Sequence, residues 1–432
     1  MSEWIHSTVG AVTAYQRAGG TPTAGTDAFY GGEIPFVTIE DITNGTRFLD
    51  RTEKNLSELG LMNSAAWLIQ EPHILYSMYA TVGKPIINRI SCATNQAIIA
   101  LKESPEIEQS FLFYQLLFIR PQVYKFTAQT TQSNLNAGSV KRLPIAYPKE
   151  KAEQKKIAAI LTSIDTAIEK TEALIEKFQQ IKAGLMHDLF TRGVLPNGQL
   201  RPPREQAPEL YQETAIGWIP SDWNVSTLRS CLTSNPTNGI YKSSDQIGLE
   251  GVLMVGQTAF TAERSVEFSL CRRGVISSGD LRRYGLSKGN ILVTRVFATV
   301  QGVGLPTLVP ELSEPAVFES NMMRLQVDLA RIVPRLLFEW LRSPAARRYI
   351  YAGANASNQC SVNQSVLNPM PVPCPHIVEQ ARIVSRIDRL DERHFSECSG
   401  LQKLLYQKLG LMQDLLTGKV PVKVGAGETA NG

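Results

Sequence analysis

Apolar side chains recur every three or four residues along the segment from residue 157 to residue 189. This spacing places them on one face of an α-helix and is typical of the seam along which two helices pair. Pro148 precedes the segment, and Gly193 and Pro196 follow it, so we predict one long helix over residues 149–192. The predicted seam consists of Ile157, Leu161, Ile164, Ile168, Ile175, Phe178, Leu185 and Leu189.

A second segment with the same spacing predicts a second long helix, over residues 376–418. In the middle of its seam, His394 and Glu397 stand where the first segment has Ile168 and Thr171. We interpret His394 as a solvated residue or one that fixes the register of the helix, because no cluster of ligating residues accompanies it; a metal or catalytic role is the alternative. The apolar seam positions are Ile383, Ile387, Leu390, Leu401, Leu404, Leu411 and Leu415.

The segments before the two helices have a different pattern. Short apolar and β-branched runs such as residues 34–39, 95–101 and 290–295 are separated by Gly, Pro, Asn and Asp, which predicts strands and turns. One helix is expected among the strands of each segment, near residues 111–118 and 336–341. We therefore expect two mixed domains, over residues 1–148 and 223–375. Residues 193–222, rich in Pro, Gly and charge, are expected to form a linker, and residues 419–432 a flexible tail.

The two halves of the chain repeat each other. GLMHDLFTRGV begins at Gly184 and GLMQDLLTGKV at Gly410, which is 410 − 184 = 226 residues later, and the EQ pairs at Glu153 and Glu379 keep the same offset. Trp4 and Trp223 begin the two copies. The chain is thus a tandem duplication.

A duplicated unit with two apolar helices predicts a specific architecture. We expect an α+β protein with two mixed α/β domains joined by two long antiparallel helices that form a coiled coil, the halves being related by a pseudo-twofold internal repeat. Such a protein can contact two patches of an extended ligand at a set separation, and DNA is the commonest ligand with regularly spaced features.

Composition narrows the class of protein only a little. The chain is 43% hydrophobic and 19% charged, as in globular proteins, and its formal charge of +4 does not by itself indicate a nucleic-acid ligand. Its six cysteines show neither CxxC pairs nor Cys/His spacing typical of zinc sites, so we expect no metal. The sequence contains no apolar run of membrane-spanning length and no signal-peptide pattern, so we expect a cytoplasmic location and no membrane contact.

The order of these features resembles the specificity (DNA-recognition) subunit of type I restriction-modification systems. The resemblance rests on Trp4 and Trp223, on IGWIPSDW before the second domain, on the two EQ pairs and on the two GLMxDL closings, and it spans nearly the whole chain. The first closing departs from the family pattern, because it reads DLFTRGV instead of DLLTG.

The resemblance implies a non-catalytic subunit of a DNA methylation and restriction enzyme. Each domain would be a target-recognition domain that reads one half of a bipartite site in double-stranded DNA, while the helices set the spacing and dock two modification (methyltransferase) subunits, which restriction (translocase/nuclease) subunits join. The sequence has neither a [DN]PP[FY] motif nor a GxxxxGK[ST] loop, and Asn368-Pro369-Met370 is a poor imitation of the first. We therefore expect no cofactor in this chain, and S-adenosylmethionine, ATP and Mg in its partners.

Candidate DNA contacts follow from basic residues that lie beside aromatic residues or turns. Gln132 and Asn136 recur as Gln359 and Asn363, which favours a structural role over base reading, because residues that read different half-sites should differ between the copies. The candidates are Arg89, Lys125, Gln132, Lys141 and Arg142 in the first domain, and Arg272, Arg273, Arg282, Arg283, Tyr284, Arg347 and Arg348 in the second.

Two other classes of protein remain possible on the sequence. One is a coiled-coil scaffold whose two globular domains bind proteins. The other is an enzyme that uses a histidine as a base, although His6, His73, His187, His376 and His394 show no motif spacing.

Overall fold

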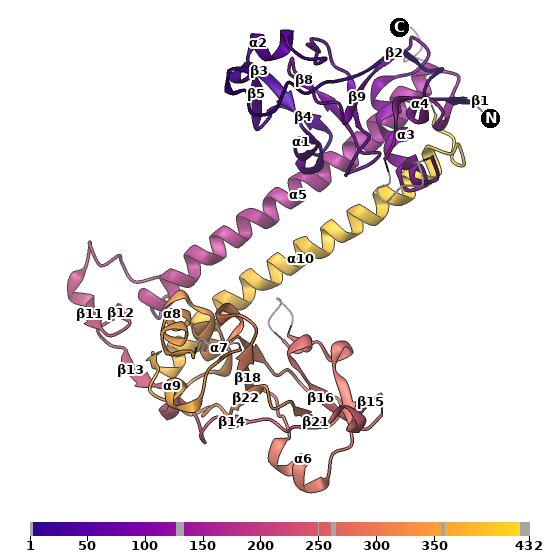
Figure 1. Ribbon diagram of the computed structural model, residues 1–432. Coiled ribbons are helices and arrows are strands. Elements are labelled where there is room, and N and C mark those ends of the chain that lie inside the picture. The colour runs from indigo at the N-terminus through magenta and orange to yellow at the C-terminus, as the bar shows by residue number, and fades with distance from the viewer. Residues whose placement is uncertain (1–2, 127–133, 249, 261–264, 356–358, 424–432) are drawn as a thin grey trace. The chain divides into compact units, whose positions relative to one another are not determined.

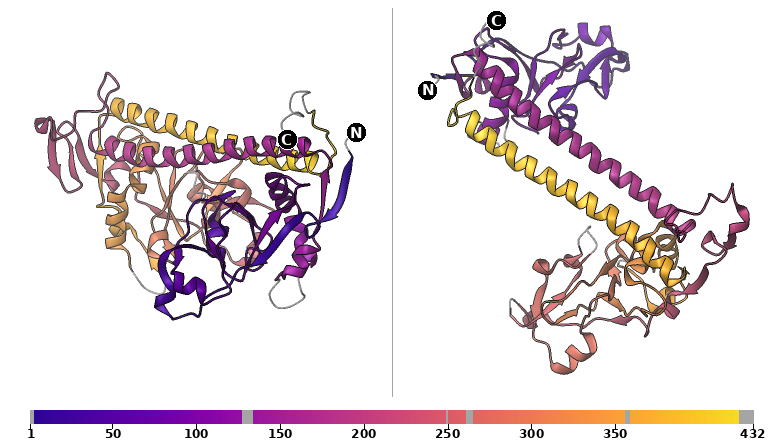
Figure 2. Two further views of the ribbon diagram at one scale, coloured as in Figure 1. Left: turned by 90° about the horizontal axis from the view of Figure 1, so that it is seen from above. Right: turned by 180° about the vertical axis from the view of Figure 1, so that it is seen from behind.

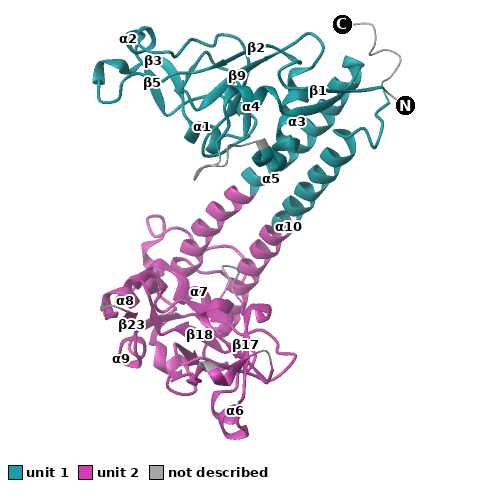
Figure 3. Ribbon diagram, turned by 45° about the vertical axis from the view of Figure 1, so that its right-hand side comes forward, with its two compact units in different colours: residues 1–174, 397–432 teal, residues 175–396 magenta. Residues whose placement is uncertain are grey.

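The chain folds into two compact units, each with its own sheets and a segment of both long helices (Figure 1). The computed structural model describes residues 3–126, 134–248, 250–260, 265–355 and 359–423. Unit 1 comprises Met1–Leu174 together with Glu397–Gly432, and unit 2 comprises Ile175–Ser396 (Figure 3). Unit 1 is therefore assembled from both end regions of the sequence, whereas unit 2 is continuous.

In unit 1, a five-stranded sheet of order β2-β9-β6-β7-β4 and a three-stranded sheet of order β5-β3-β8 form the domain, and β1 pairs with β10. The strands are β1 (Trp4–Thr8), β2 (Thr13–Ala18), β3 (Tyr30–Val37), β4 (Phe48–Leu49), β5 (Lys54–Leu56), β6 (Ile74–Ser77), β7 (Pro85–Asn88), β8 (Ala93–Thr94), β9 (Ile98–Glu103) and β10 (Pro144–Pro148). The helices are α1 (Ile39–Asn44), α2 (Glu58–Met62), α3 (Gln109–Ile119), α4 (Ala137–Lys141) and the first part of α5 (Lys151–Thr191).

In unit 2, two four-stranded sheets have the orders β14-β22-β18-β20 and β15-β17-β16-β21, and three further strand pairs are β11-β12, β13-β24 and β19-β23. The strands are β11 (Tyr211–Thr214), β12 (Gly217–Pro220), β13 (Asn224–Thr227), β14 (Thr237–Asn238), β15 (Ile247–Gly248), β16 (Val252–Val255), β17 (Arg272–Gly274), β18 (Ile291–Thr294), β19 (Val296–Phe297), β20 (Pro306–Leu308), β21 (Ala316–Phe318), β22 (Met322–Leu325), β23 (Cys360–Ser361) and β24 (Pro371–Cys374). The helices are the end of α5, α6 (Ser278–Tyr284), α7 (Pro334–Arg342), α8 (Pro344–Gly353), α9 (Gln364–Leu367) and the first half of α10 (Ile377–Leu415), whose second half belongs to unit 1.

The central strands are buried on both faces, which explains why they read as continuous apolar runs in the sequence. All four residues of β6 and all four of β18 are buried. In unit 1, α3 packs against β7 and β9, and in unit 2, α7 packs against β20. Each domain therefore has its own core between a sheet and a helix.

The two domains repeat the same hydrogen bonds at the turn between two core strands. The Ser77 hydroxyl donates to the Thr81 carbonyl and accepts from the Lys84 amide at 3.1 Å. At the equivalent turn, the Thr294 hydroxyl donates to the Gly302 carbonyl and accepts from the Leu305 amide at 2.9 Å. The parallel pairing of β3 with β8 also recurs as that of β16 with β21. The duplication seen in the sequence is therefore a duplication of fold.

Within each unit, the segments of the two long helices run antiparallel (Figure 2). In unit 1, Asp165 near the start of α5 pairs with Lys408 near the end of α10 at 2.6 Å. In unit 2, Asp391 near the start of α10 pairs with Lys182 near the end of α5 at 3.0 Å. Asp391 and Lys408 are the repeats of Asp165 and Lys182, so one ion pair is made twice with the roles of the helices exchanged. The expected antiparallel helix pair is confirmed.

The apolar faces of the long helices merge with the domain cores. In unit 1, Ile157 and Leu161 belong to the same buried cluster as Met412 and Leu415. In unit 2, Leu189 belongs to one cluster with Ile383 and Ile387. All fifteen seam positions named from the sequence are buried or half-buried, and His394 is half-buried.

The segment 193–222, expected to be a linker, is ordered and belongs to unit 2. It contains the antiparallel hairpin β11–β12, and Val194 and Ile219 lie in the unit 2 core. The Gln212 amide holds the base of the hairpin by donating to the Trp223 carbonyl at 2.7 Å. Pro and Gly favour tight turns such as that of this hairpin.

The observed bounds of the long helices differ from the expected bounds by a few residues at most. Helix ends are hard to predict, because the sequence encodes capping and fraying only weakly. Among the described residues, none of the helices combines the length and apolarity needed to cross a lipid bilayer.

Candidate nucleic-acid interface and the helix junctions

The glutamine of each EQ pair ties its long helix to its domain by the same three hydrogen bonds. Gln154 is fully buried; its amide donates to the carbonyls of Glu106 and Pro148 at 3.0 and 2.9 Å, and its oxygen accepts from the Glu108 amide at 2.7 Å. Gln380 repeats these bonds with Arg331, Pro375 and Val333 at 2.9, 2.9 and 2.8 Å. Because a buried amide must satisfy both its donor and its acceptor, this residue fixes the angle between domain and helix.

The repeated GLMxDL closing ends each helix on the tryptophan that begins the domain of the same unit. Gly193 and Gly418 have φ values of +63° and +72°, the left-handed conformation that stops a helix and favours glycine. A Cβ atom would lie 2.5 Å from Trp223 Cζ2 at Gly193 and 2.5 Å from Trp4 Nε1 at Gly418. Both the conformation and the space therefore require glycine at these two positions.

A buried carboxylate completes the junction in unit 2. Glu379 accepts hydrogen bonds from both terminal nitrogens of Arg201 at 2.5 and 3.1 Å, from Trp223 Nε1 at 3.2 Å and from the Val194 amide at 2.8 Å. Arg201 also pairs with Asp222 at 2.7 Å. Hydrogen bonds to the two carboxylates outweigh the effect of burial and raise the pKa of Arg201. The junction is therefore a fully paired, structural charge network.

The candidate residues of the first domain lie on its surface. Arg89 stacks on the Phe48 ring, 3.5 Å from its centroid, and pairs with Asp50 at 3.6 Å. Lys125, Lys141 and Arg142 are exposed, the first at the end of a 3₁₀ helix (Arg120–Phe126) and the others at the end of α4. Gln132 lies outside the described residues. Each of the four described side chains remains a candidate contact.

In the second domain, two of the basic pairs differ in whether their side chains form ion pairs. Arg272 pairs with Glu319 at 2.8 Å, and Arg273 pairs with Glu314 through both terminal nitrogens at 2.8 and 2.6 Å. Arg282 and Arg283, at the end of α6, are exposed, and within the described part of the chain neither has an acidic partner. The Arg283 guanidinium lies 5.3 Å from the centroid of the Tyr284 ring. Arg282 and Arg283 are thus better placed to meet an anion than Arg272 and Arg273.

Arg347 is not a surface contact, which corrects the expectation from its sequence pattern. Its side chain is only 8% exposed and donates to the carbonyls of Gln301 and Val303 at 3.0 and 2.6 Å. In unit 1, Arg120 makes the equivalent bond to the Val82 carbonyl at 3.1 Å. Arg347 and Arg348 are neighbours in α8. Arg347 faces the core, and Arg348 is exposed.

The recurring asparagines cap short helices. Asn136 Oδ1 accepts from the Ser139 amide at 2.8 Å at the start of α4, and Asn363 Oδ1 accepts from the Val366 amide at 3.2 Å at the start of α9. An N-cap satisfies backbone donors that have no partner within the helix. This role explains why asparagine is found in both copies and agrees with the structural interpretation drawn from the sequence.

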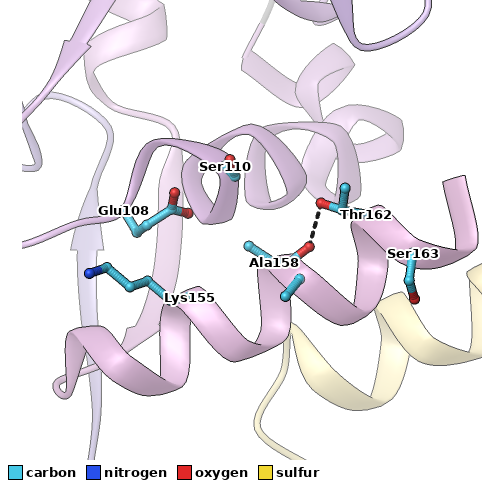
Figure 4. A pocket seen from close by; sticks show the side chains of 7 residues that line it. Glu108, Ser110, Lys155, Ala158, Thr162 and Ser163 are labelled. Carbon is cyan, nitrogen blue, oxygen red and sulfur yellow. Dashed lines mark hydrogen bonds between the residues drawn. The ribbon is translucent and has the colours of Figure 1, made fainter. Parts of the chain in front are cut away.

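A hollow of about 390 Å³ lies between the start of α3 and the first turns of α5 in unit 1 (Figure 4). Three of its polar side chains are engaged locally: Glu108 accepts from the Phe111 amide at 2.6 Å, and Thr162 and Ser163 donate to carbonyls of their own helix at 2.6 and 2.7 Å. Among the described residues, no three His, Cys, Asp or Glu side chains cluster as metal ligands would.

The sequence interpretation missed the Asp–Lys pairs between the long helices. Asp165 and Asp391 keep the repeat offset, as do Lys182 and Lys408. Opposite charges conserved between the two copies at opposite ends of a helix were the signal that could have identified them. Arg201 had no such signal, because it lies in the one segment that is not repeated.

These features define a duplicated protein with two mixed α/β domains, each attached by hydrogen bonds to a pair of antiparallel helices. Residues 1–180 match the family model described as type I restriction modification DNA specificity domain. The type I restriction enzyme MjaVIII specificity subunit of Methanocaldococcus jannaschii is 22% identical over 431 residues, which cover 98% of this chain and 94% of that protein. The EcoBI specificity subunit of Escherichia coli is 23% identical, over 91% of this chain and 80% of that protein.

Solved structures show the same fold. The type I restriction-modification S subunit from M. genitalium superposes with a TM-score of 0.56 at 15% identity, over 98% of this chain and 97% of that chain. A chain from a structural study of the assembly of a type I R-M system superposes with a TM-score of 0.59 at 13% identity, over 96% and 98%. The first 180 residues therefore resemble a type I restriction modification DNA specificity domain, and nearly the whole chain is similar to type I specificity subunits.

Proposed function

We propose that this protein is the non-catalytic subunit that gives a type I restriction-modification enzyme its DNA specificity, and that each domain reads one half of a bipartite target. Residues 1–148 and 223–375 would be the two target-recognition domains. The observation that carries this proposal is the repeated junction: the same buried glutamine and closing glycine attach each domain to the helices, and the same Asp–Lys pair joins the helices in each unit. A chain that builds the same support twice presents two readers to one ligand.

The helices would set the spacing between the half-sites and dock two methyltransferase subunits, with restriction subunits joining them. Exposed apolar side chains on α10 support a protein contact: Phe395 is 66% exposed in unit 2, and Tyr406 and Leu409 are 66% and 64% exposed in unit 1. Large apolar side chains left on a helix surface favour burial against a partner. Methyl transfer and cleavage, with S-adenosylmethionine, ATP and Mg, would take place in those partners in the cytoplasm.

A domain exchange tests the two-reader proposal. The full chain, with residues 1–147 replaced by the recognition domain of a relative, is expressed with its methyltransferase subunits, and methylated sites in the host DNA are sequenced. We expect one half of the target to change and the other half to stay the same. A target that changes in both halves, or not at all, would contradict the proposal, and a chain that forms the complex but ignores DNA would favour a protein scaffold instead.

A helix insertion tests the spacing role separately. Adding one heptad to α5 and one to α10 preserves both seams, because a heptad completes two turns of a paired helix. We expect both half-sites to be retained with a changed gap between them. The matched control adds the same seven residues between Ala215 and Ile216, in the turn of the β11–β12 hairpin, where the gap should stay constant.

A further inference from the structure

The short helices α2 and α6 occupy the same place in the two domains. Each follows the strand that pairs antiparallel with an equivalent core strand: Phe36 faces Lys54 in one domain, and Met254 faces Arg272 in the other. A serine caps both helices, since Ser57 Oγ accepts from the Gly60 amide at 3.1 Å and Ser277 Oγ accepts from the Asp280 amide at 3.0 Å. In Figures 1 and 3, each helix lies at the end of its own domain remote from the long helices.

The α6 helix is held at both ends. Lys242 pairs with Asp280 in its first turn at 3.6 Å. At its end, the buried Arg324 donates to the carbonyls of Gly285 and, at 3.1 Å, Arg283. The Tyr284 ring packs edge-on against Phe318 with centroids 6.4 Å apart. A buried guanidinium that binds the last carbonyls fixes the backbone that carries Arg282 and Arg283, since those carbonyls otherwise lack partners.

The α2 helix is also held against its domain. Ser57 Oγ donates to the Ala28 carbonyl at 2.6 Å, and Gly60 lies so close to the Phe29 carbonyl that a Cβ atom would collide with it. Leu61 packs into a buried cluster of its domain, as Leu281 does in the second. Both helices therefore present one defined face outward.

The outward faces carry different chemistry on this common support. Counting from the capping serines, Met62 corresponds to Arg282 and Asn63 to Arg283. Met62 is 75% exposed, and Leu59, one turn before it, is 48% exposed. Elsewhere the copies repeat their structural side chains, as at Gln154 and Gln380. A position that keeps its backbone, its cap and its exposure but changes its side chain has the properties required of a specificity determinant.

We propose that α2 and α6 are the base-reading elements of the two domains, with Leu59, Met62 and Asn63 contacting one half-site and Arg282 and Arg283 the other. This inference rests on the proposed function. Arginine binds the O6 and N7 atoms of guanine through two parallel hydrogen bonds, whereas apolar side chains contact the thymine methyl group. The half-site read by α6 therefore contains a guanine, and the half-site read by α2 contains a thymine at the contacted position.

The test uses the full chain with its methyltransferase subunits and sequences the methylated sites in host DNA. We expect Arg282→Ala and Arg283→Ala to lower discrimination at one or two base pairs of a single half-site by roughly 10- to 100-fold, and Met62→Ala with Leu59→Ala to do so in the other half-site. Met62→Arg should introduce a preference for guanine in the half-site read by α2. Arg331→Ala is the matched control, because Arg331 is an exposed arginine of the same unit at the α10 junction, and it should leave the target unchanged.

Each outcome separates this inference from the proposed function. If wild-type protein directs methylation to a bipartite target that the α2 and α6 variants leave unchanged, the inference is wrong while the proposed function stands. If wild-type protein directs methylation to no bipartite target, the proposed function itself fails. A variant that loses methylation while keeping its thermal unfolding temperature and its binding to the methyltransferase subunits supports the inference, because only recognition is then lost.

Discussion

Asp165 and Lys408 form an ion pair that Asp391 and Lys182 repeat on the opposite helices, at 2.6 and 3.0 Å. Tyr114 of α3 donates to Asp165 at 2.7 Å, and Arg335 of α7 donates to Asp391 at 2.7 Å, so both carboxylates also tie the helix pair to the domain. Each pair thus joins three helices within its unit.

We expect Lys408→Met and Lys182→Met each to lower the free energy of unfolding by about 1–3 kcal/mol, between the values for exposed and buried pairs. The loss should be larger in Lys408→Met, because Asp391 keeps its ion pair with Arg335 when Lys182 is removed, whereas Asp165 keeps the hydrogen bond from the neutral Tyr114. Urea denaturation monitored by circular dichroism measures them, with hydrogen exchange showing which unit opens. Lys403→Met, an exposed lysine of α10, is the control and should change stability little. A larger loss in Lys182→Met than in Lys408→Met would contradict this account.

The Arg201–Glu379 network should be the most sensitive point of unit 2. Arg201→Met leaves a buried carboxylate without its cation, which costs roughly 3–5 kcal/mol in buried pairs. The control is Arg204→Met, three residues away, because Arg204 is exposed, stacks on Trp218 at 4.6 Å and pairs with the exposed Glu205 at 3.9 Å. Thermal unfolding compares the two variants. If Arg201→Met were as stable as Arg204→Met, the network would not support the junction.

The closing glycines should tolerate no side chain. Gly193→Ala and Gly418→Ala combine a left-handed backbone with a collision against tryptophan, so we expect each to cost more than about 2 kcal/mol. Gly198→Ala isolates the conformational part, since Gly198 has φ +81° and open space around its missing Cβ. It should lose only about 1 kcal/mol. Unfolding temperatures that fall equally in all three variants would show that the contact with tryptophan is unimportant.

Two cysteines of unit 2 influence each other's protonation. Their sulfur atoms lie 3.7 Å apart, and the hydrogen bond from Cys231 lowers the pKa of Cys374 to about 7. The same hydrogen bond, together with burial, raises the pKa of Cys231. Cys374 therefore ionises as the pH rises through about 7. In Cys231→Ala the donor is lost, so the midpoint of Cys374 alkylation should move up toward the ordinary value of about 8.5.

Mass spectrometry of iodoacetamide labelling between about pH 6 and pH 10 measures that midpoint, because this range spans the shifted and the ordinary thiol pKa. Cys360→Ala, which removes another buried thiol of the same unit, should leave it unchanged. A midpoint that is the same in wild-type and Cys231→Ala protein would show that the two thiols do not interact.

The long helices and the duplication could be predicted from the sequence because both depend on periodicity, which a single chain displays directly. The residues of the ion pairs between the helices keep the repeat offset, so these pairs could also have been predicted from the sequence. Short elements such as α2 and α6 could not be predicted, because five to seven residues carry too little periodic signal and their stability comes from tertiary contacts such as that of Arg324.

The candidate site was less predictable than the fold. Arg347 and Arg348 are identical in sequence type, and only the helix orientation decides that the first lies against the Val303 carbonyl and the second in solvent. The ordered segment 193–222 shows the same limit, since Pro and Gly occur both in tight turns and in flexible linkers.

The make-up of unit 1 has a consequence for how the chain acquires its structure during synthesis. Gln115 donates to the Leu416 carbonyl at 2.8 Å across 301 residues, whereas unit 2 uses only a continuous stretch. The ribosome releases residues 175–396 before residues 397–416. Unit 2 can therefore complete its contacts while unit 1 still lacks the last part of α10. Unit 1 contains the residues that are synthesised first, but it completes its fold last because it also needs the residues that are synthesised last.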